Sequence, residues 1–516
     1  MKYYGIIRKR FSEKTLYNFF KLKYFYSQFT TFNKEKRKFR KFYYNRCFVK
    51  QSSFCDENLA IPKDKYIIPI CIITSDLVLR ENIPQLKSGL IKLLKKHYSH
   101  KFIGCSITID EMIANIEKMD NVLSSWVNSL NIGRFDFERY STLSQDISYF
   151  DIYIKNINSS YLSIEFHIYP TDNYQKEQLQ IINNDYKNVN GYIKQHFIQN
   201  HKISGGKTTS TVINYNNAHL KSDLIYENIC ILKWKFYNEI QIYFPTILHK
   251  KDIIPPSINI YKTNLNYQEK NIDVFLNSIG ISNDEGQFID ESKRIFFHTN
   301  LSSRYEHNKR TDLVYVVNEV TLDHKDMYYS IDFQIVCELS ENLSTNIFKF
   351  AFLDALNELA SKNLIFYKLK LNKIKLQKNR LNKILKLRYM YEKDIDFYRR
   401  YVCVDIWERA TKKITNVFNG KISKRYNDFR FLTEAPVITK DKIVREMKVM
   451  STEFDEKTSI LQHLAAYKNE TINKVINVVM LVLTITTLIF VIFPSLSTDV
   501  ANFLLKIWIF IKAFFK

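Results

Sequence analysis

The sequence contains few of the residues that usually interrupt regular structure, with 10 glycines and 9 prolines among 516 residues. Its seven cysteines are scattered and form no C-x-x-C pair, which argues against a zinc site or a disulfide framework and indicates a reducing compartment. No apolar run near the N-terminus has the length of a signal sequence, so we expect the bulk of the chain to stay in the cytosol. Since 46% of the residues are hydrophobic, the chain is expected to fold rather than to be disordered.

Acidic residues are scarce relative to basic ones, 53 against 76, which gives a formal net charge of +23. Lys, Asn, Ile, Tyr and Phe are all abundant, as an AT-rich genome would encode, so a single lysine carries little weight. The total charge still favours anionic partners such as nucleotides, nucleic acid or an anionic lipid surface. Residues 1–58 are predicted to form a basic, aromatic-rich arm for nucleic acid or a membrane surface, or else a solvated and partly helical face. Nucleic acid is not the partner that we expect for the chain as a whole.

Residues 59–344 carry alternating strand and helix signals, and we predict a cytosolic α+β sensing domain rich in antiparallel sheet. Apolar and polar residues alternate over 147–157 and 161–170, which predicts an antiparallel hairpin. The apolar run 66–74 is expected to be a buried strand, and "IPQLKSGLIKLLKKHY" after it has helical spacing. Further strands are predicted over residues 229–237, 240–245, 312–320 and 329–339.

Residues 345–470 have a helical pattern, which predicts a bundle or stalk of long helices. A three-four spacing, interrupted at Lys378, predicts one long helix through Leu364, Tyr367, Leu371, Ile374, Leu381 and Leu385. The segment 368–388 holds nine Lys or Arg and no acid. Such a density of like charge favours a nearby acidic partner, ligand or membrane surface, or else the solvated outside of a coiled coil.

Helix breakers are expected at residues 418–420 ("FNG") and at Pro436. From about Asp441 the helical pattern continues without proline or glycine into the apolar segment that begins at Val475. The stalk helix and the membrane helix are therefore predicted to be one continuous helix.

Residues 471–516 are predicted to form a transmembrane hairpin. The first span, 475–493, has no charged side chain and measures about 28 Å, close to the ~30 Å thickness of the hydrocarbon core. The second apolar segment, 500–515, either forms a second span, with Lys506 and Lys512 reaching the headgroups, or lies in the interface. Basic residues flank the hairpin on one side, so both termini and the main domain are expected on the cytoplasmic side of the inner (plasma) membrane.

Polar residues recur on one face of the first span and of the helix leading into it. At about 100° per residue, one stripe roughly 80° wide contains Asn469, Asn473, Asn477, Met480, Thr484 and Thr487. Polar side chains in hydrocarbon need partners. Three explanations stay open: the stripe lines a pore in a homo-oligomer, it bonds helices together, or it arises by chance.

A cytosolic α/β domain followed by a long helix, a first span, a short outer turn and a second span resembles the CorA superfamily of pentameric membrane channels. The resemblance covers the layout of residues 345–516, and it implies a homo-oligomer, a pentamer, whose first span lines the pore. The family's Gly-Met-Asn signature, tied to hydrated magnesium, should follow the first span, where this chain has "PSLS" at 494–497. Ordinary magnesium uptake is therefore in doubt.

The large soluble part is similar to the CorA-like membrane effectors of type III CRISPR systems. That resemblance implies a channel-like effector in a prokaryotic anti-phage response, gated by a nucleotide second messenger such as the S-adenosylmethionine–AMP conjugate. Two alternatives stay open, a membrane-anchored interaction or toxin-like protein without ion conduction and a divalent-cation transporter.

A nucleotide ligand would most reasonably bind at "SGGKTTS", whose Gly205, Gly206, Lys207 and Thr208 can form an anion nest beside a cation. His201 stands where a Walker A loop needs glycine, and a plain flexible loop is the alternative. The scattered histidines form neither a convergent metal set nor a catalytic triad. We therefore expect no enzyme activity, no metal and no cofactor.

Overall fold

The structure is a computed structural model of the chain, and it describes residues 47–51, 61, 64–96, 99–100, 111, 114–116, 129–137, 141–184, 189–193, 211–215, 217–251, 253–264, 286–289, 295–298, 312–318, 331–374, 380–402, 407–417, 430–492, 502, 505–506 and 509. The chain divides into two compact units. The first unit comprises Met1–Glu358 and Arg399–Lys440, and the second comprises Leu359–Tyr398 and Asp441–Lys516.

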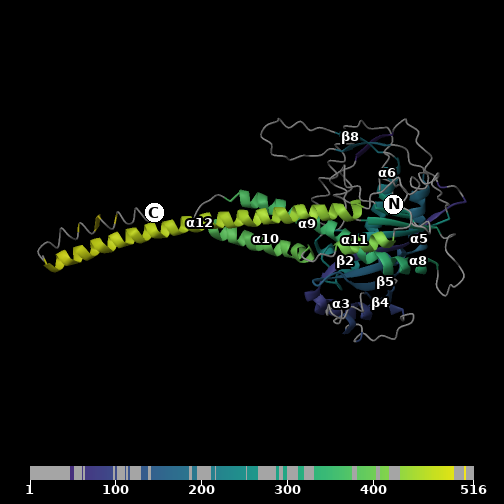
Figure 1. The fold of residues 1–516 in the computed structure, drawn as a ribbon, viewed down its shortest axis with the longest axis horizontal. Helices are drawn as coiled ribbons and strands as arrows, with labels where there is room; N and C mark the ends of the chain where they lie inside the picture. Colours follow the sequence, from purple (N-terminus) through teal and green to yellow (C-terminus); the bar gives the residue numbers. More distant parts are fainter. Residues whose placement is uncertain are drawn as a thin grey trace. The chain divides into compact units, whose positions relative to one another are not determined.

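The first unit is built on a mixed, mostly antiparallel sheet (Figure 1). Its described strands follow the order β10-β11-β12-β9-β2-β6-β5-β4-β3, in which the β12–β9 pair is parallel and the other pairs are antiparallel. The strands are β2 (Ile67–Leu79), β3 (Ser99–His100), β4 (Ser129–Phe135), β5 (Ile147–Asn156), β6 (Tyr161–Pro170), β9 (Ser257–Thr263), β10 (Gly286–Ile289), β11 (Ile295–His298) and β12 (Asp312–Asn318). A smaller antiparallel sheet joins β1 (Cys47–Gln51), β7 (Val189–Ile193) and β8 (Thr211–Tyr215). The predicted α+β class with a largely antiparallel sheet is confirmed.

One face of the larger sheet is apolar and packs against α3 (Ile83–Lys96), α5 (Asp172–Asn183) and α6 (Asn217–Ile240). Successive strand residues point to opposite faces, so every second residue of β5 and β6 enters this core. The core residues of these two strands include Phe150, Ile152, Ile154, Ile164, Phe166 and Ile168. A Cβ at Gly89 of α3 would lie 1.6 Å from the carbonyl oxygen of Tyr243, so glycine is required where α3 meets this turn.

The opposite face of the same strands carries polar and charged side chains. It is covered by α8 (Ile331–Leu339) and by the π-helical turn η7 (Ser340–Ser344), which leads directly into α9. The short 3-10 turns η2 (Arg80–Asn82), η3 (Thr142–Gln145) and η4 (His249–Lys251) connect elements of this unit. Helix α11 (Trp407–Val417) packs its first residue, Trp407, against Phe350 of α9, with ring centroids 5.8 Å apart.

Several expected elements are confirmed: the hairpin appears as β5 and β6, the apolar run as β2, the following helix as α3, and the segment from Asp312 as β12. Three predicted strands are wrong. Residues 229–237 belong to α6, residues 240–245 form the end of α6 and a turn, and residues 329–339 contribute to α8. Each segment is rich in buried apolar side chains on several sides, so its apolar run looked like a strand although its length and packing favour a helix.

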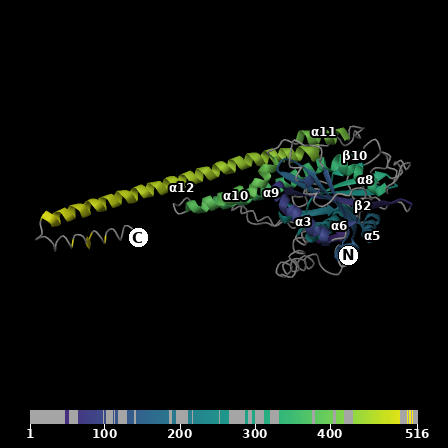
Figure 2. The same cartoon turned by 90° about the horizontal axis from the view of Figure 1, so that it is seen from below.

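The described part of the second unit is a bundle of three helices, α9 (Thr345–Asn372), α10 (Leu381–Val402) and α12 (Arg430–Ile492), each of which also contributes residues to the first unit. Asn363 and Tyr367 of α9 both bond to Asp394 of α10, and Arg388 of α10 pairs with Asp455 of α12. Asn357 and Leu371 of α9 contact Pro436 and Lys457 of α12 in the same order, so α9 and α12 are parallel to each other and antiparallel to α10 (Figures 1 and 2). The bundle core includes Leu364, Tyr367, Leu371, Ile384, Leu387, Tyr391, Ile395, Ile443, Met447, Met450, Phe454 and Leu461.

The bundle corrects two predictions. The single helix expected through residues 364–385 is instead two antiparallel helices, because α9 ends at Asn372 and α10 begins at Leu381. Pro436 does not end a helix, since α12 begins earlier, at Arg430. A proline forfeits one intrahelical hydrogen bond, and the carbonyl of Pro436 gains one from Nδ2 of Asn357 at 2.9 Å. The predicted continuity from the stalk into the apolar segment is confirmed, because α12 runs unbroken to Ile492.

Candidate functional site

The polar stripe predicted from the sequence lies on α12, and all of its side chains are exposed in the single chain. These are Asn469, Asn473, Asn477, Met480, Thr484 and Thr487. The same face continues at Val491, which is apolar and 74% exposed, so the polar character ends before the helix does. Among the described residues, none covers the stripe, so its side chains are open to water or to another molecule in a membrane.

The threonine hydroxyls in this helix bond back to their own backbone. Thr484 donates to the carbonyl of Met480 at 2.7 Å, and Thr487 donates to that of Leu483 at 2.8 Å. Each hydroxyl has one hydrogen and two acceptor lone pairs, so its donor is satisfied and acceptor capacity remains on the exposed side. The threonines therefore need no partner helix. The side chains of the stripe that still need hydrogen-bond partners are mainly the amides of Asn469, Asn473 and Asn477.

A different face of α12 is less exposed than the stripe. The bundle core on this helix extends from Ile443 to Leu461. Toward the C-terminus, the same face of the helix carries the half-buried Ile472, Val475, Val479 and Val482. Thr486 lies on this face and is 4% exposed, in contrast to Thr484 and Thr487. In the described part of the chain, α12 thus has one partly buried face and another, exposed face that bears the stripe.

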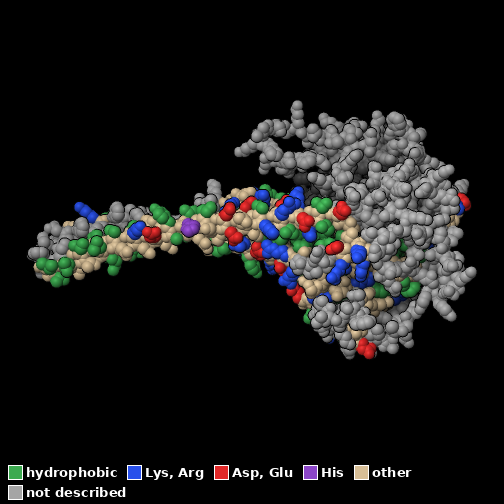
Figure 3. Space-filling model, in the orientation of Figure 1, with side chains coloured by type: hydrophobic (Ala, Val, Ile, Leu, Met, Phe, Trp, Pro, Cys, Tyr) green, Lys and Arg blue, Asp and Glu red, His purple; other side chains and the backbone are tan. Residues whose placement is uncertain are grey.

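Among the described residues, α12 is the one helix whose length and composition allow it to cross a membrane, within the stretch Pro436–Leu488. Hydrophobic side chains gather along its C-terminal part on the face seen in Figure 3. Those that are exposed include Ile476, Val478, Leu481, Leu483, Ile485 and Leu488. This composition supports association with a membrane.

The predicted second span is described at four positions, Asn502, Leu505, Lys506 and Ile509, which are helical and exposed. The rest of 500–515 lies outside the described residues, and so does the turn at 494–497. The predicted phosphate-binding residues Gly205, Gly206, Lys207 and Thr208 also lie outside them, as do residues 1–46 of the basic arm.

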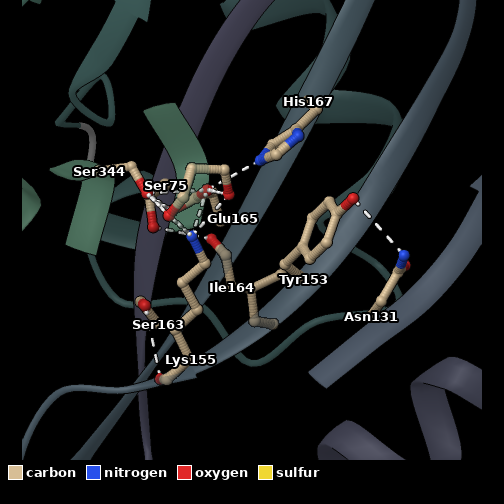
Figure 4. Close-up of polar contacts among 10 residues, drawn as sticks. Ser75, Asn131, Tyr153, Lys155, Ser163, Ile164, Glu165, His167 and Ser344 are labelled. Carbon is tan, nitrogen blue, oxygen red and sulfur yellow. Dashed lines mark hydrogen bonds and ion pairs between the residues drawn. The ribbon is translucent and has the colours of Figure 1, made fainter. Parts of the chain in front are cut away.

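A buried charged cluster, which the sequence did not reveal, lies on the polar face of the larger sheet (Figure 4). Nζ of Lys155 on β5 contacts Oε1 of Glu165 on β6 at 2.8 Å, and neither side chain is more than 3% exposed. The ammonium also donates to the hydroxyls of Ser340 and Ser344, each at 2.8 Å, and to the carbonyl of Ser340 at 2.9 Å. All of the hydrogen-bonding capacity of Lys155 is therefore used.

Glu165 is the centre of this cluster. Its carboxylate accepts from Lys155, Ser340 and Ser344, and His167 lies 2.8 Å away through Nε2. Burial is the largest influence on the Glu165 pKa and raises it, but the Lys155 ammonium and the hydrogen bond to His167 outweigh burial and lower the pKa to about 2. Glu165 is therefore ionised at neutral pH.

His167 has one satisfied and one unsatisfied ring nitrogen. Because the ionised Glu165 can only accept, Nε2 of His167 carries the hydrogen of their bond. Nδ1 is buried and has no hydrogen-bond partner in the described structure. The ring stacks on Tyr153, with centroids 4.3 Å apart.

A second ion pair lies beside this cluster on the same face of the sheet. Arg134 of β4 binds both carboxylate oxygens of Asp151, at 2.8 and 3.0 Å. Its guanidinium also lies 3.9 Å from the centre of the Tyr149 ring and 5.8 Å from that of Phe333 on α8. A third pair joins a strand to α8 directly, because Nζ of Lys262 on β9 contacts Oδ1 of Asp332 at 2.8 Å.

The contacts of this cluster connect β5 and β6 to η7. Its charges are paired, and the described residues contain no group of three or more His, Cys, Asp or Glu side chains able to hold a metal. Its contacts fix η7, and therefore the start of α9, to the middle of the sheet. The sequence held a weak signal for it: in 147–157 and 161–170 the alternate positions that do not enter the apolar core read Tyr, Asp, Tyr, Lys and Ser, Glu, His, Tyr.

Comparison of the chain with protein-family models, with curated proteins and with solved structures found no match.

Proposed function

We propose that the chain is a CorA-like homo-oligomeric membrane channel or membrane effector that crosses the membrane with α12. One observation carries this proposal. The helix that is long and apolar enough to cross a membrane bears polar side chains on a face that its own chain leaves exposed. Burying the amide of Asn477 in lipid without partners costs free energy, so this face favours water or other copies of the helix.

Homo-oligomerisation satisfies this requirement most simply. In a ring of identical subunits, the same face of each α12 points to the symmetry axis, and the polar stripes together surround a path through the membrane. The acceptor lone pairs of Thr484 and Thr487 would then face that path. A pentamer and a second span over 500–515 complete the proposed CorA-like layout.

In this proposal the first unit lies in the cytosol and senses a nucleotide second messenger, as in a type III CRISPR anti-phage response. Helices α9, α10 and α12 each contribute residues to both units, and α12 continues into the apolar segment. The residues proposed to contact the nucleotide remain Gly205, Gly206, Lys207 and Thr208.

The back-bonded threonines favour a second candidate, a membrane-anchored protein without ion conduction. Because these hydroxyls are satisfied within the helix, their presence in lipid costs little. In that case the asparagines near the cytoplasmic end lie at the headgroups or bond between helices.

Ion flux from vesicles containing the purified full chain, with and without nucleotides, separates the two candidates. Thr484→Val and Thr486→Val form a matched pair, because both hydroxyls bond back to the helix but only Thr484 lies on the exposed stripe. A channel loses conductance with Thr484→Val and keeps it with Thr486→Val. Equal flux in both variants contradicts a path lined by the stripe, and a monomeric chain without flux under any nucleotide tested contradicts the channel.

A further inference from the structure

The α9–α10 hairpin ends in a basic tip, which we define as Lys368, Lys370, Lys373, Arg380, Lys383 and Lys386. All of these side chains are exposed except Arg380, which is half-buried. Within the described part of the chain none of them is in an ion pair. Arg388, the next basic residue on α10, is different because it pairs with Asp455 of α12.

The tip lies at the end of the bundle nearer the apolar segment of α12. Helices α9 and α12 run in the same direction, and Nζ of Lys457 donates to the carbonyl of Leu371, one turn or less from the end of α9. The last fully buried residue of the bundle core on α12 is Leu461, which is 0% exposed. From this level α12 continues alone toward Val475.

The distance from the tip to the membrane follows from the helix rise. Leu461 and Val475 are separated by about 21 Å at 1.5 Å per residue. The headgroup region occupies about 6 Å of this length. Extended lysine side chains shorten the remaining gap to about one Debye length, ~8 Å at physiological ionic strength. The tip is therefore close enough to interact electrostatically with a charged lipid surface.

The basic tip also carries exposed apolar side chains. Ile365 is 62% exposed, Phe366 46% and Leu369 58%, and the Lys370 ammonium lies 4.1 Å from the centre of the Phe366 ring. The acidic residues of α12 near this level are Glu453, Asp455 and Glu456, and no ion pair joins them to the tip in the described structure. A surface with unpaired cations and exposed apolar groups matches the chemistry of an anionic headgroup layer.

We propose that the basic tip of the α9–α10 hairpin binds the anionic lipid headgroups of the leaflet that faces the soluble domain. This inference rests on the proposed membrane crossing by α12. A membrane is favoured over another anionic partner because the tip lies on the membrane side of the bundle, along the helix that would enter the lipid. The contact would brace the bundle against the bilayer at a point far from the span in the sequence.

Lysine acetylation of the full chain in nanodiscs, followed site by site by mass spectrometry, tests this contact. One set of nanodiscs contains phosphatidylcholine alone, and the other adds phosphatidylglycerol. We expect Lys373, Lys383 and Lys386 to react about fivefold more slowly in the anionic nanodiscs, with the protection lost at high salt. Lys393 and Lys442, exposed in the same unit but away from the tip, should react equally in both.

Equal reactivity of the tip in both lipids, with α12 resistant to alkaline extraction, overturns the inference and leaves the proposed membrane crossing intact. If alkali extracts the chain from the membrane, both the lipid contact of the tip and the proposed membrane crossing are overturned. Reaction of the tip lysines that is equally slow in both nanodiscs and slower than that of Lys393 and Lys442 indicates cover by another copy of the chain and also overturns lipid binding.

A pair of triple variants provides an independent readout. We expect the thermal stability of the chain to be higher in anionic than in neutral nanodiscs. Replacing Lys373, Lys383 and Lys386 together with glutamine should abolish that difference, whereas replacing Lys393, Lys442 and Lys448 should preserve it. If both triple variants retain the difference, the tip does not bind the lipid.

Discussion

Lys155 and Glu165 form a 2.8 Å ion pair between neighbouring strands in the interior of the first unit, and the serines of η7 complete its hydrogen bonding. Removing water from two charges is costly, and such a pair is tolerated because each charge is fully compensated. The pair therefore joins the sheet to η7 and the start of α9. Each partner is needed to compensate the buried charge of the other.

Replacing Lys155 with methionine leaves Glu165 buried without its ammonium. We expect the first unit to lose about 3–5 kcal/mol of stability, the usual cost of removing one member of a buried pair. The double variant Lys155→Met/Glu165→Met should regain most of this loss, because no unpaired charge remains. Thermal unfolding of the purified chain measures both, and a double variant as unstable as the single one would contradict the account.

The Glu165 pKa predicts an acid dependence. Its folded pKa is about 2 against 4.5 for the unpaired group, so the ionised carboxylate stabilises the fold fully above pH 4.5. That contribution falls progressively as the pH drops from 4.5 towards 2. The stability difference between the wild type and Glu165→Gln should therefore shrink over this window. The exposed Asp172→Asn serves as the control, and a difference that grows on acidification would be opposite to the expected sign.

Ser344→Ala removes a hydroxyl that contacts both Lys155 and Glu165. Leaving buried charged groups short of a hydrogen bond costs about 1–3 kcal/mol. Hydrogen exchange should therefore accelerate in η7 and in the first turns of α9. Ser148→Ala, on the same strand as Lys155 but exposed, should leave exchange there unchanged. No change in η7 with Ser344→Ala would show that the cluster does not hold this turn.

Tyr367→Phe tests the packing of the second unit. The Tyr367 hydroxyl donates to Oδ2 of Asp394, and burial together with this carboxylate raises the tyrosine pKa. Loss of a hydrogen bond to a charged group should lower the melting temperature, at a cost of about 1.5–3 kcal/mol. Tyr389→Phe is the matched control, because Tyr389 lies on α10 with 69% of its side chain exposed. Equal melting temperatures for the two variants would show that the bond contributes nothing.

The spacing of apolar residues along the sequence predicted those strands and helices that bury apolar side chains on one face only. Strands β5 and β6 alternate, and α12 keeps a three-four spacing through Met447, Met450 and Phe454, so each was recognisable. Helices α6 and α8 were mistaken for strands because they bury apolar side chains on several sides, which hides the helical period. The break between α9 and α10 was missed because Leu381 resumes the same apolar phase after the turn.

The site was predicted only in part, for a physical reason. Phasing along one helix is a local property, so the stripe from Asn469 to Thr487 could be found from the sequence. The charged cluster depends on strand register and on contacts of Ser340 and Ser344 with residues roughly 180 positions earlier, as loops between them close. Nothing in the local sequence around Ser344 indicates its partners.

The most direct test of the central claim is whether the polar stripe of α12 faces water inside the membrane. Single cysteines are placed at Asn477, Met480 and Thr484 on the stripe and at Val478, Leu481 and Ile485 on the neighbouring apolar surface. The reconstituted full chain is then treated with a water-soluble thiol reagent, and modification is read by mass spectrometry. We predict fast modification at the three stripe positions and slow modification at the other three. Equal protection of all six positions, or faster reaction on the apolar surface, would contradict a water-lined path.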